Sequence, residues 1–347
     1  MLHSLLSLAV LATTTAVGAA LPTSPADTPK CTTPQKRNSW HDTSDADKKA
    51  YLAANRCLLT SPQKQNIFPG AKTRWDEFVA LHQLHALQIH TTGQFLPYHR
   101  YYIKVLEFLL LECGYHGPLA YWDEPRDAGK FSKSLLLDTN LGFGGSGKGT
   151  QNCVTDGPFA NLTVNIGPGF KSQPRCVNRK ITDAFSSQTG ATYVASAIKG
   201  STYKEALDAI YSGPHLLGHM ALSMMNGDSI TSSGDPLFFM HHGFVDKMWR
   251  DWQLKDLTKR LKDISGLNAQ DPAVGFSEFS GGIEVESAMW GKPTPEMLAV
   301  TPDPTSGDGG KKELTLGHVM SSLGIIPNAT VADVMDTKGG YLCYEYV

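Results

Sequence analysis

The sequence predicts a mainly α-helical protein, an antiparallel four-helix bundle with long loops and little β structure, built around two metal ions. Long stretches of the chain carry apolar residues at helical spacing, with Pro and Gly near their ends. Nine of the twelve histidines fall between positions 82 and 242, and eight of them form two separate groups, at 82–99 and 215–242. Neutral imidazole is a good ligand for copper, zinc and iron, so two groups with three candidate ligands each predict two metal ions.

The first helices are expected in the N-terminal third of the chain. Residues 45–59 have a helical pattern, and residues 73–87 carry Trp75 and Phe78 on one apolar stripe. The sequence Thr-Thr-Gly at 91–93 interrupts this pattern. The helix that begins near residue 73 should therefore end close to His90.

A second long helix is expected over 97–113. Pro97 suits its first turn, and Gly114 suits its end. Residues 128–180 then change character, because five glycines crowd a polar stretch that also contains two cysteines. We expect a long surface loop there, held by a disulfide.

The second half of the chain supplies the remaining helices. Residues 203–211 have a helical pattern, and Gly213-Pro214 is expected to restart the chain into a helix that carries His215 and His219. A further helix is expected from Leu237 to about Leu261. The chain beyond Gly266 is rich in Pro and Gly and predicts loops. One domain over 31–347, with no C-terminal shielding domain, is the expected organisation.

Composition excludes several classes of partner. The chain has 347 residues and a formal net charge of −2, with its basic residues scattered along the sequence. Neither nucleic acid nor a membrane surface is therefore an expected partner. We expect a monomer or a weak dimer that acts on a small molecule.

The N-terminus and the cysteines predict a secreted, extracellular protein. Residues 1–19 have the apolar core and small residues of a signal peptide, and the Pro-rich lead over 20–30 is a candidate for trimming. Asn161 and Asn328 begin glycosylation sequons. Six cysteines allow fifteen pairings, and an even number suits disulfides. The predicted pairs are Cys153–Cys176 across the Gly-rich loop, Cys57–Cys113 between early helices, and Cys31–Cys343 joining the ends.

One candidate metal site contains His215 and His219. These residues stand at i and i+4, so both rings project from the same face of a helix toward one ion. A third ligand must come from elsewhere, and the following helix offers His242. Taken alone, an i, i+4 pair of histidines more often belongs to an ordinary helix face, and the second histidine group is what favours metal.

The other candidate site contains His82, His90 and His99. An unbroken helix would place the first two Cα atoms about 12 Å apart and rotate their side chains away from each other. The break at 91–93 lets the His90 ring turn back, and His99 in the next helix completes a triad. His85 competes with His82, because it lies three residues away on nearly the same face.

These residues carry a resemblance to a known family. The stretch from His90 to Arg100, which contains Phe-Leu-Pro-Tyr-His-Arg at 95–100, resembles the copper-A motif of tyrosinases and catechol oxidases, the type-3 copper proteins. Residues 235–249, Asp-Pro-Leu-Phe-Phe-Met-His-His-Gly-Phe-Val-Asp-Lys-Met-Trp, look like the copper-B signature. Tyr-Trp-Asp at 121–123 and Tyr-Glu-Tyr at 344–346 also match family landmarks. The resemblance covers about residues 31–347 and is closest to the short, secreted fungal branch.

The resemblance implies a role for each site residue. Two copper ions would be held, one by each histidine group, with O2 as co-substrate. His241 is then the non-ligand neighbour near the substrate, Phe238 packs against His242, and Asp246 is placed to accept a hydrogen bond from a ligand ring. Arg37 is expected to stack near Tyr344 or Tyr346. The implied ligands are His82, His90 and His99 for copper A and His215, His219 and His242 for copper B.

The same resemblance predicts an oxidase of o-diphenols, with o-aminophenols as further substrates. Relatives that also hydroxylate monophenols commonly place an acid and an Asn beside the first copper-B histidine. Here Leu216 follows His215, and Leu216 with Met220 forms an apolar rim. Asp208 is the acid that could still assist. A tyrosinase with monooxygenase activity is the alternative, and an oxygen-binding or inactive secreted protein is the non-enzyme alternative.

Overall fold

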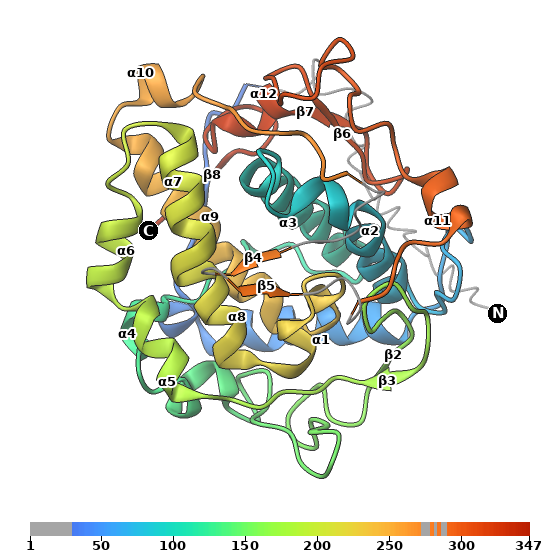
Figure 1. The fold of residues 1–347 in the computed structure, drawn as a ribbon. Coiled ribbons are helices and arrows are strands. Elements are labelled where there is room, and N and C mark those ends of the chain that lie inside the picture. The colour runs from blue at the N-terminus through green and yellow to red at the C-terminus, as the bar shows by residue number, and fades with distance from the viewer. Residues whose placement is uncertain (1–29, 272–277, 281–282, 286–289) are drawn as a thin grey trace, which may run out of the picture.

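The computed structural model describes residues 30–271, 278–280, 283–285 and 290–347. Helices make up most of its regular structure (Figure 1), so the mainly α-helical prediction is confirmed. The predicted signal peptide over 1–19 and nearly all of the Pro-rich lead lie outside the described residues. Among the helices of the described segments, none is both long enough and apolar enough to cross a membrane.

Four helices surround the two histidine groups. They are α2 (Arg74–Ile89), α3 (Phe95–Glu112), α8 (Leu216–Leu222) and α9 (Leu237–Leu254). Helix α3 packs against both α2 and α9. The remaining helices are α1 (Asp45–Thr60), α4 (Glu124–Asp127), α5 (Asp183–Ser186), α6 (Ala191–Ala197), α7 (Tyr203–Ile210), α10 (Leu257–Arg260), α11 (Pro295–Val300) and α12 (Val331–Met335).

Local capping explains where α2 begins and ends. The side chain of Thr73 accepts from the backbone N–H of Asp76, and the Asp76 carboxylate accepts from the backbone N–H of Thr73. Every side chain of α2 is buried. The helix ends where His90 adopts extended geometry and Thr91 has a φ of 54°. The prediction that the helix stops near His90 is therefore confirmed.

The chain between α7 and α8 is a distorted helix and not a clean restart. A π-helical turn, η6 (Tyr211–His215), joins the two helices. Gly213 lies inside it with non-helical φ of −98° and ψ of −115°. Because Pro214 cannot donate a backbone hydrogen bond, the distortion falls where the ladder is already interrupted. His215 thus lies at the end of a bend that turns it toward α9.

Helix α9 is shorter than the sequence pattern indicated. The predicted helix ran to about Leu261, but α9 ends at Leu254 and α10 begins at Leu257. The carboxylate of Asp256 accepts from the backbone N–H of Lys259, which starts a new helical turn. Asp256 caps α10 and so separates it from α9, although the apolar spacing of the sequence continues across the break.

β structure is limited to short pairs of strands, as expected. The parallel pair β1 (Gln35–Arg37) and β8 (Tyr344–Tyr346) brings both ends of the domain together. The antiparallel pairs are β2 (Thr163–Val164) with β3 (Arg175–Cys176), β4 (Glu278–Ser280) with β5 (Ile283–Val285), and β6 (Val319–Met320) with β7 (Ala329–Thr330).

The three predicted disulfides are all present. They join Cys31 to Cys343, Cys57 to Cys113, and Cys153 to Cys176. The last one lies within the long loop over 128–180, as the sequence indicated. Both sequon asparagines, Asn161 and Asn328, are exposed.

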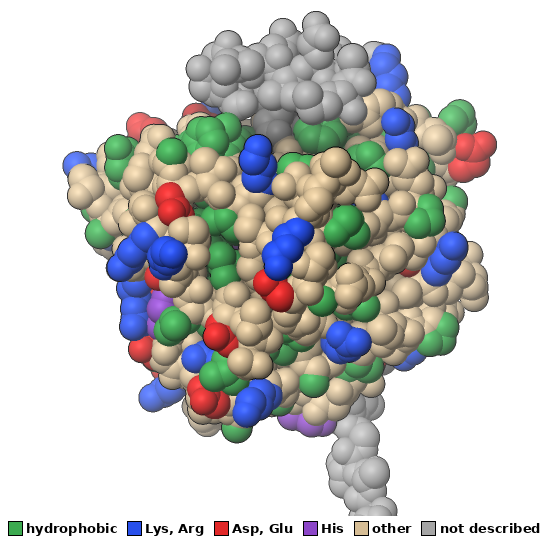
Figure 2. Space-filling view, turned by 90° about the horizontal axis from the view of Figure 1, so that it is seen from below, with side chains coloured by type: hydrophobic (Ala, Val, Ile, Leu, Met, Phe, Trp, Pro, Cys, Tyr) green, Lys and Arg blue, Asp and Glu red, His purple; other side chains and the backbone are tan. Residues whose placement is uncertain are grey.

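The face of the molecule drawn in Figure 2 is mixed in charge. On this face, acidic and basic side chains are interspersed among polar and apolar atoms. This distribution agrees with the small net charge of −2.

Candidate metal centre

Site A consists of His82, His90 and His99. Each offers a ring nitrogen, and the three nitrogens lie within 4.8 Å of one another. His82 comes from the interior of α2, His90 caps the end of that helix, and His99 lies in the second turn of α3. All three side chains are at most 3% exposed. The end of α2 at His90 is what brings these residues together.

The rings of site A are oriented by backbone carbonyl groups. Nδ1 of His82 lies 2.9 Å from the Ile230 oxygen, Nδ1 of His90 lies 3.1 Å from the Ala86 oxygen, and Nδ1 of His99 lies 2.7 Å from the Phe95 oxygen. A carbonyl can only accept, so each Nδ1 carries the proton and each Nε2 is left with its lone pair. Nε2 of His82 and Nε2 of His99 are 3.3 Å apart. This is the ring orientation that a metal ion requires.

His85, the competing candidate for site A, lies outside the group. Its Nδ1 lies 2.9 Å from the Leu81 oxygen, and its ring packs on Tyr98 with centroids 5.0 Å apart. Its buried Nε2 has no hydrogen-bond partner among the described residues. The structure therefore groups His82, and not His85, with His90 and His99.

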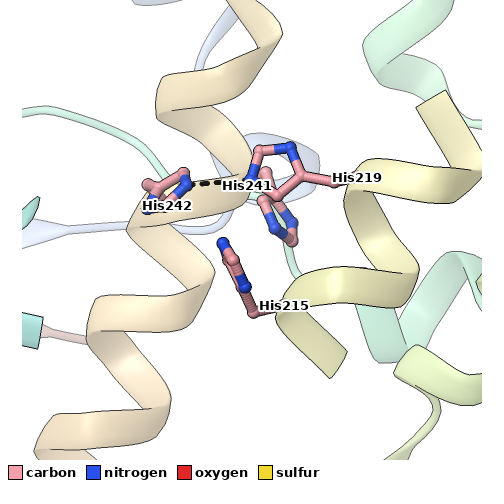
Figure 3. Close-up of side chains that lie close together, drawn as sticks. All are labelled: His215, His219, His241 and His242. Carbon is pink, nitrogen blue, oxygen red and sulfur yellow. Dashed lines mark hydrogen bonds between the residues drawn. The ribbon is translucent and has the colours of Figure 1, made fainter. Parts of the chain in front are cut away.

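Site B consists of four histidines. His215 and His219 extend from the end of η6 and from α8 toward α9, which carries His241 and His242 (Figure 3). One ring nitrogen from each lies within 4.8 Å of the others. Nε2 of His219 and Nε2 of His242 are 3.1 Å apart. The i, i+4 spacing predicted from the sequence thus places two rings on one face, although a π turn precedes α8.

His241 differs from the other three histidines because a carboxylate holds it. Its Nδ1 donates to Oε1 of Glu124 at 2.5 Å, and both side chains are fully buried. Gly218 faces this pair, and a β-carbon at that position would collide with the His241 ring. Sequence reasoning missed Glu124, because this residue lies in a short helix 117 residues before its partner. Three histidines and one histidine bonded to a carboxylate therefore share this space.

Burial keeps the ligand candidates neutral. Desolvation lowers the pKa of His82 to about 4 and lowers the pKa of His90, His99, His215, His219 and His242 well below the usual value. Neutral imidazole is the form that binds a metal. Both groups consist of histidine alone, with no Asp, Glu or Cys among the grouped residues of the described chain. This donor set suits copper or zinc better than magnesium or calcium.

The histidine rings of sites A and B pack against one another and against the same two phenylalanines. The rings of His99 and His242 are stacked with centroids 4.4 Å apart. Phe238 stacks on His242 at 3.9 Å and meets the His82 ring edge-on at 5.4 Å. Phe95, which the sequence did not single out, lies 4.6 Å from both His99 and His215. Two ions bound at these sites would therefore be neighbours within one buried centre.

The expected role of Asp246 is wrong. Its carboxylate does not contact a ligand ring but accepts from Arg100 Nε at 2.5 Å and from the hydroxyl groups of Tyr344 and Tyr346. These three donors occupy both oxygens and hold the C-terminal strand against α9. The guanidinium of Arg37 lies 3.4 Å from the centre of the Tyr344 ring, as expected. Asp246 anchors the C-terminal strand and does not orient a ligand.

The residues expected near the substrate lie around one side of α8. Leu216 and Met220 are half-buried on that helix. Asp208 is 58% exposed and pairs with Lys204 at 2.6 Å. It lines a cavity of about 580 Å³ together with residues that follow His90 and with Tyr211, which precedes His215 by one turn. Asp208 thus lies at the surface on the flank of the centre.

Comparison with known proteins identifies the family. Residues 72–255 match the common central domain of tyrosinase. The tyrosinase-like protein phomQ1' of Diaporthe leptostromiformis is 30% identical over 91% of this chain and 81% of its own length. The N-acetyl-6-hydroxytryptophan oxidase ivoB of Emericella nidulans is 26% identical over 99% of this chain and all of its own length.

A solved structure leads to the same family. A mutant polyphenol oxidase from Thermothelomyces thermophila superimposes with a TM-score of 0.73 and 25% identity, covering 92% of this chain and 91% of that one. The family binds a dinuclear copper centre, and the two histidine groups are compatible with it. The chain therefore belongs to the tyrosinase family of type-3 copper proteins and is an oxidase of that family.

Proposed function

We propose that the protein is a secreted dicopper oxidase that converts o-diphenols to o-quinones, with o-aminophenols as further substrates. The observation that carries this proposal is the pair of buried, histidine-only groups that meet through the stacked rings of His99 and His242. Copper A would be held by site A. Copper B would be held by His215, His219 and His242. When bound, the two coppers supply a two-electron redox centre that is open to O2.

The reaction balances without a further co-reactant. Two molecules of o-diphenol lose two electrons and two protons each and become o-quinones. One O2 accepts the four electrons and the four protons and becomes two molecules of water. The protein's own contribution is to hold neutral imidazoles in place and to keep bulk water away from them.

Backbone carbonyl groups and a few buried side chains hold the imidazole rings in place. Backbone carbonyl groups fix the tautomer of the three site A rings and of His215, whose Nδ1 lies 3.1 Å from the Tyr211 oxygen. Phe95 and Phe238 pack between the ligand rings and exclude water. The assignment of His242 as the ligand is supported by its Nε2, which lies 3.1 Å from Nε2 of His219, and by its stacking on His99 of site A. Glu124 holds His241 through Nδ1 beside these rings.

The surroundings of His215 favour diphenols over monophenols. Leu216 and Tyr211 offer no carboxylate beside this ring, and Asp208 is engaged by Lys204 at the surface. A phenol with two adjacent hydroxyl groups loses its proton more readily and has less need of a nearby base. Tyrosinase activity on monophenols is the second candidate, supported by relatives that are named tyrosinases.

Secretion is supported by the disulfides and by the exposed glycosylation sequons. All six cysteines form disulfides, and both sequon asparagines are exposed. Disulfides of this kind persist in an oxidising compartment. We propose that residues 1–19 direct export.

Oxygen uptake tests the proposed reaction. The full chain is loaded with copper, its metal content is measured, and O2 consumption is followed with catechol, 2-aminophenol and tyramine. We expect two coppers per chain, fast uptake with catechol or 2-aminophenol, and slow uptake with tyramine. Faster turnover of tyramine than of catechol would overturn the preference for diphenols, and no uptake with any of the three would overturn the oxidase proposal.

A further inference from the structure

One ligand candidate of site A takes its orientation from a distant part of the chain. His90 and His99 donate through Nδ1 to carbonyl groups four residues earlier, as helical geometry allows. His82 donates instead to the carbonyl of Ile230, which is 148 residues away. Ile230 lies in the segment that joins α8 to α9, here called the connecting segment (residues 223–236). The helices of site B are thus linked to the first ligand of site A.

A buried carboxylate holds the Ile230 peptide in place. Asp228 is 2% exposed. Its Oδ1 accepts from the backbone N–H groups of Ile230 and Thr231 at 3.1 and 3.2 Å. Its Oδ2 accepts from the Thr231 hydroxyl at 2.5 Å and from the Gly169 N–H at 2.9 Å. These contacts fix the direction of the carbonyl that meets His82.

An arginine fixes the other side of the same turn. Nη2 of Arg175 donates to the Thr231 hydroxyl oxygen at 2.6 Å, and Nη1 lies 3.4 Å from Oδ2 of Asp228. Arg175 neighbours Cys176, which is bonded to Cys153. The backbone approaches so closely here that a side chain on Gly167 would collide with Arg175 and Thr231. Gly167 also has a φ of 97°, which favours glycine.

The segment between β2 and β3, which contains Gly167, also contacts α2, the helix that carries His82. The amide of Gln83 donates to the Gly169 and Lys171 oxygens, each at 2.8 Å. Gln83, next to His82, and Asp228, which holds the Ile230 peptide, are therefore both hydrogen-bonded to the backbone of residues 169–171. This arrangement sets the distance between the His82 ring and its acceptor.

We propose that Asp228 and Arg175 are positioning residues for site A, acting through the Ile230 carbonyl on the tautomer and direction of the His82 ring. The inference rests on the proposed dicopper function. Partners that orient a metal ligand typically change metal affinity by about 10- to 100-fold when they are removed. Loss of this network should weaken copper at site A and spare copper at site B.

The test is a copper titration of the full chain with Asp228→Asn. Asn keeps the shape but places a donor where Thr231, Gly169 and Arg175 all donate. We expect one of the two coppers to bind about 10- to 100-fold more weakly against a competing chelator. Partly loaded protein should then show the electron paramagnetic resonance signal of an isolated Cu(II), which a coupled pair of Cu(II) ions does not give.

Glu77→Gln is the matched control. Glu77 is a fully buried carboxylate on α2 that pairs with Arg74 at 2.8 Å and accepts from two backbone N–H groups. Glu77→Gln should destabilise the protein as Asp228→Asn does, because each removes a buried carboxylate. Glu77 does not contact the Ile230 peptide, so both coppers should bind as in the wild type. Thr231→Val serves if Asp228→Asn fails to fold, with a weaker but site-selective loss expected.

The outcomes separate the two proposals. Equal loss at both sites, equal effects of the control and the test variant, or wild-type copper affinity in both Asp228→Asn and Thr231→Val would overturn the positioning role. A wild-type chain that binds fewer than two coppers would instead refute the dicopper function.

Discussion

Sites A and B hold their rings by different means. In site A all three Nδ1 atoms are bonded to backbone carbonyl groups. In site B only His215 has such a bond, and the buried Nδ1 atoms of His219 and His242 have no hydrogen-bond partner among the described residues. Site B is instead held by ring packing, above all by Phe238 against His242. Site A is preorganised by the backbone, whereas site B depends on its neighbours.

The largest expected effect comes from removing a ring of site A. His82→Ala should remove one copper and lower oxidase activity more than about 100-fold, beyond what the loss of a supporting partner costs. His85→Ala is the control, because His85 is as deeply buried but packs on Tyr98 outside the group. Metal analysis and oxygen uptake measure both effects. Loss of copper in the His85 variant would show that site A is wrongly drawn.

The next effect tests whether packing holds site B. Phe238→Ala should cost about 3–5 kcal/mol in the free energy of unfolding. It should weaken copper B more than copper A, because His242 loses its stacking partner while His82 keeps its bond to Ile230. Denaturant unfolding and copper titration give the two quantities.

Phe239→Ala is the control for that variant. Phe239 is equally buried on α9 but stacks on Phe78 at 5.0 Å, away from the histidine rings. It should lose similar stability and keep both coppers. If Phe238→Ala weakens both coppers equally, the contrast between the two sites does not hold.

Sequence reasoning worked where the interactions are local. The start of α2 near residue 73, the spacing of His215 and His219, and the end of α2 at His90 all depend on residues within one or two helical turns. These features could be predicted because neighbouring residues determine them. The three disulfides are not local, since their cysteines are 23, 56 and 312 residues apart, and they were predicted from where the cysteines lie in the expected elements.

Contacts between distant segments could not be predicted in the same way. Asp246 was expected to serve a ligand ring, but its partners lie about a hundred or more residues away. The Ile230 carbonyl that orients His82 has no sequence signature, because every residue carries a carbonyl. Glu124 reaches His241 only because residues 121–124 run along α9. The supporting contacts of the centre are therefore a property of the fold.

Lowering the pH should destabilise the copper-free protein, with a smaller loss of unfolding free energy than Phe238→Ala causes. Burial lowers the pKa of both His82 and His85 to about 4, from an ordinary value of 6.5. Above pH 6.5 neither the folded nor the unfolded state holds the extra proton. Between pH 6.5 and 4 the unfolded state takes it up first, so stability falls as the pH falls, by at most about 3 kcal/mol per ring.

Variants separate this effect from metal binding. His82→Gln and His85→Gln should each flatten the dependence of the unfolding free energy on pH in the copper-free protein. Only His82→Gln should change the pH at which copper is released, because protons compete with the metal at that ring. A copper-release profile that shifts equally in both variants would place His85 in the centre.

The smallest expected effect concerns the substrate side of site B. Leu216 follows His215 and is half-buried on α8. Leu216→Asn introduces a polar group that can hold a water molecule beside the phenol, so the ratio of tyramine to catechol turnover should rise by about tenfold or less, which is about 1 kcal/mol. Leu217→Asn, one position further along the same helix, is the control and should leave the ratio unchanged. A rise in both variants would mean that a polar group anywhere on this turn of α8 suffices. No rise in either would mean that proton removal does not limit monophenol turnover. The second result would move the origin of selectivity away from the packing-dependent site B and toward the cavity lined by Asp208 and Tyr211.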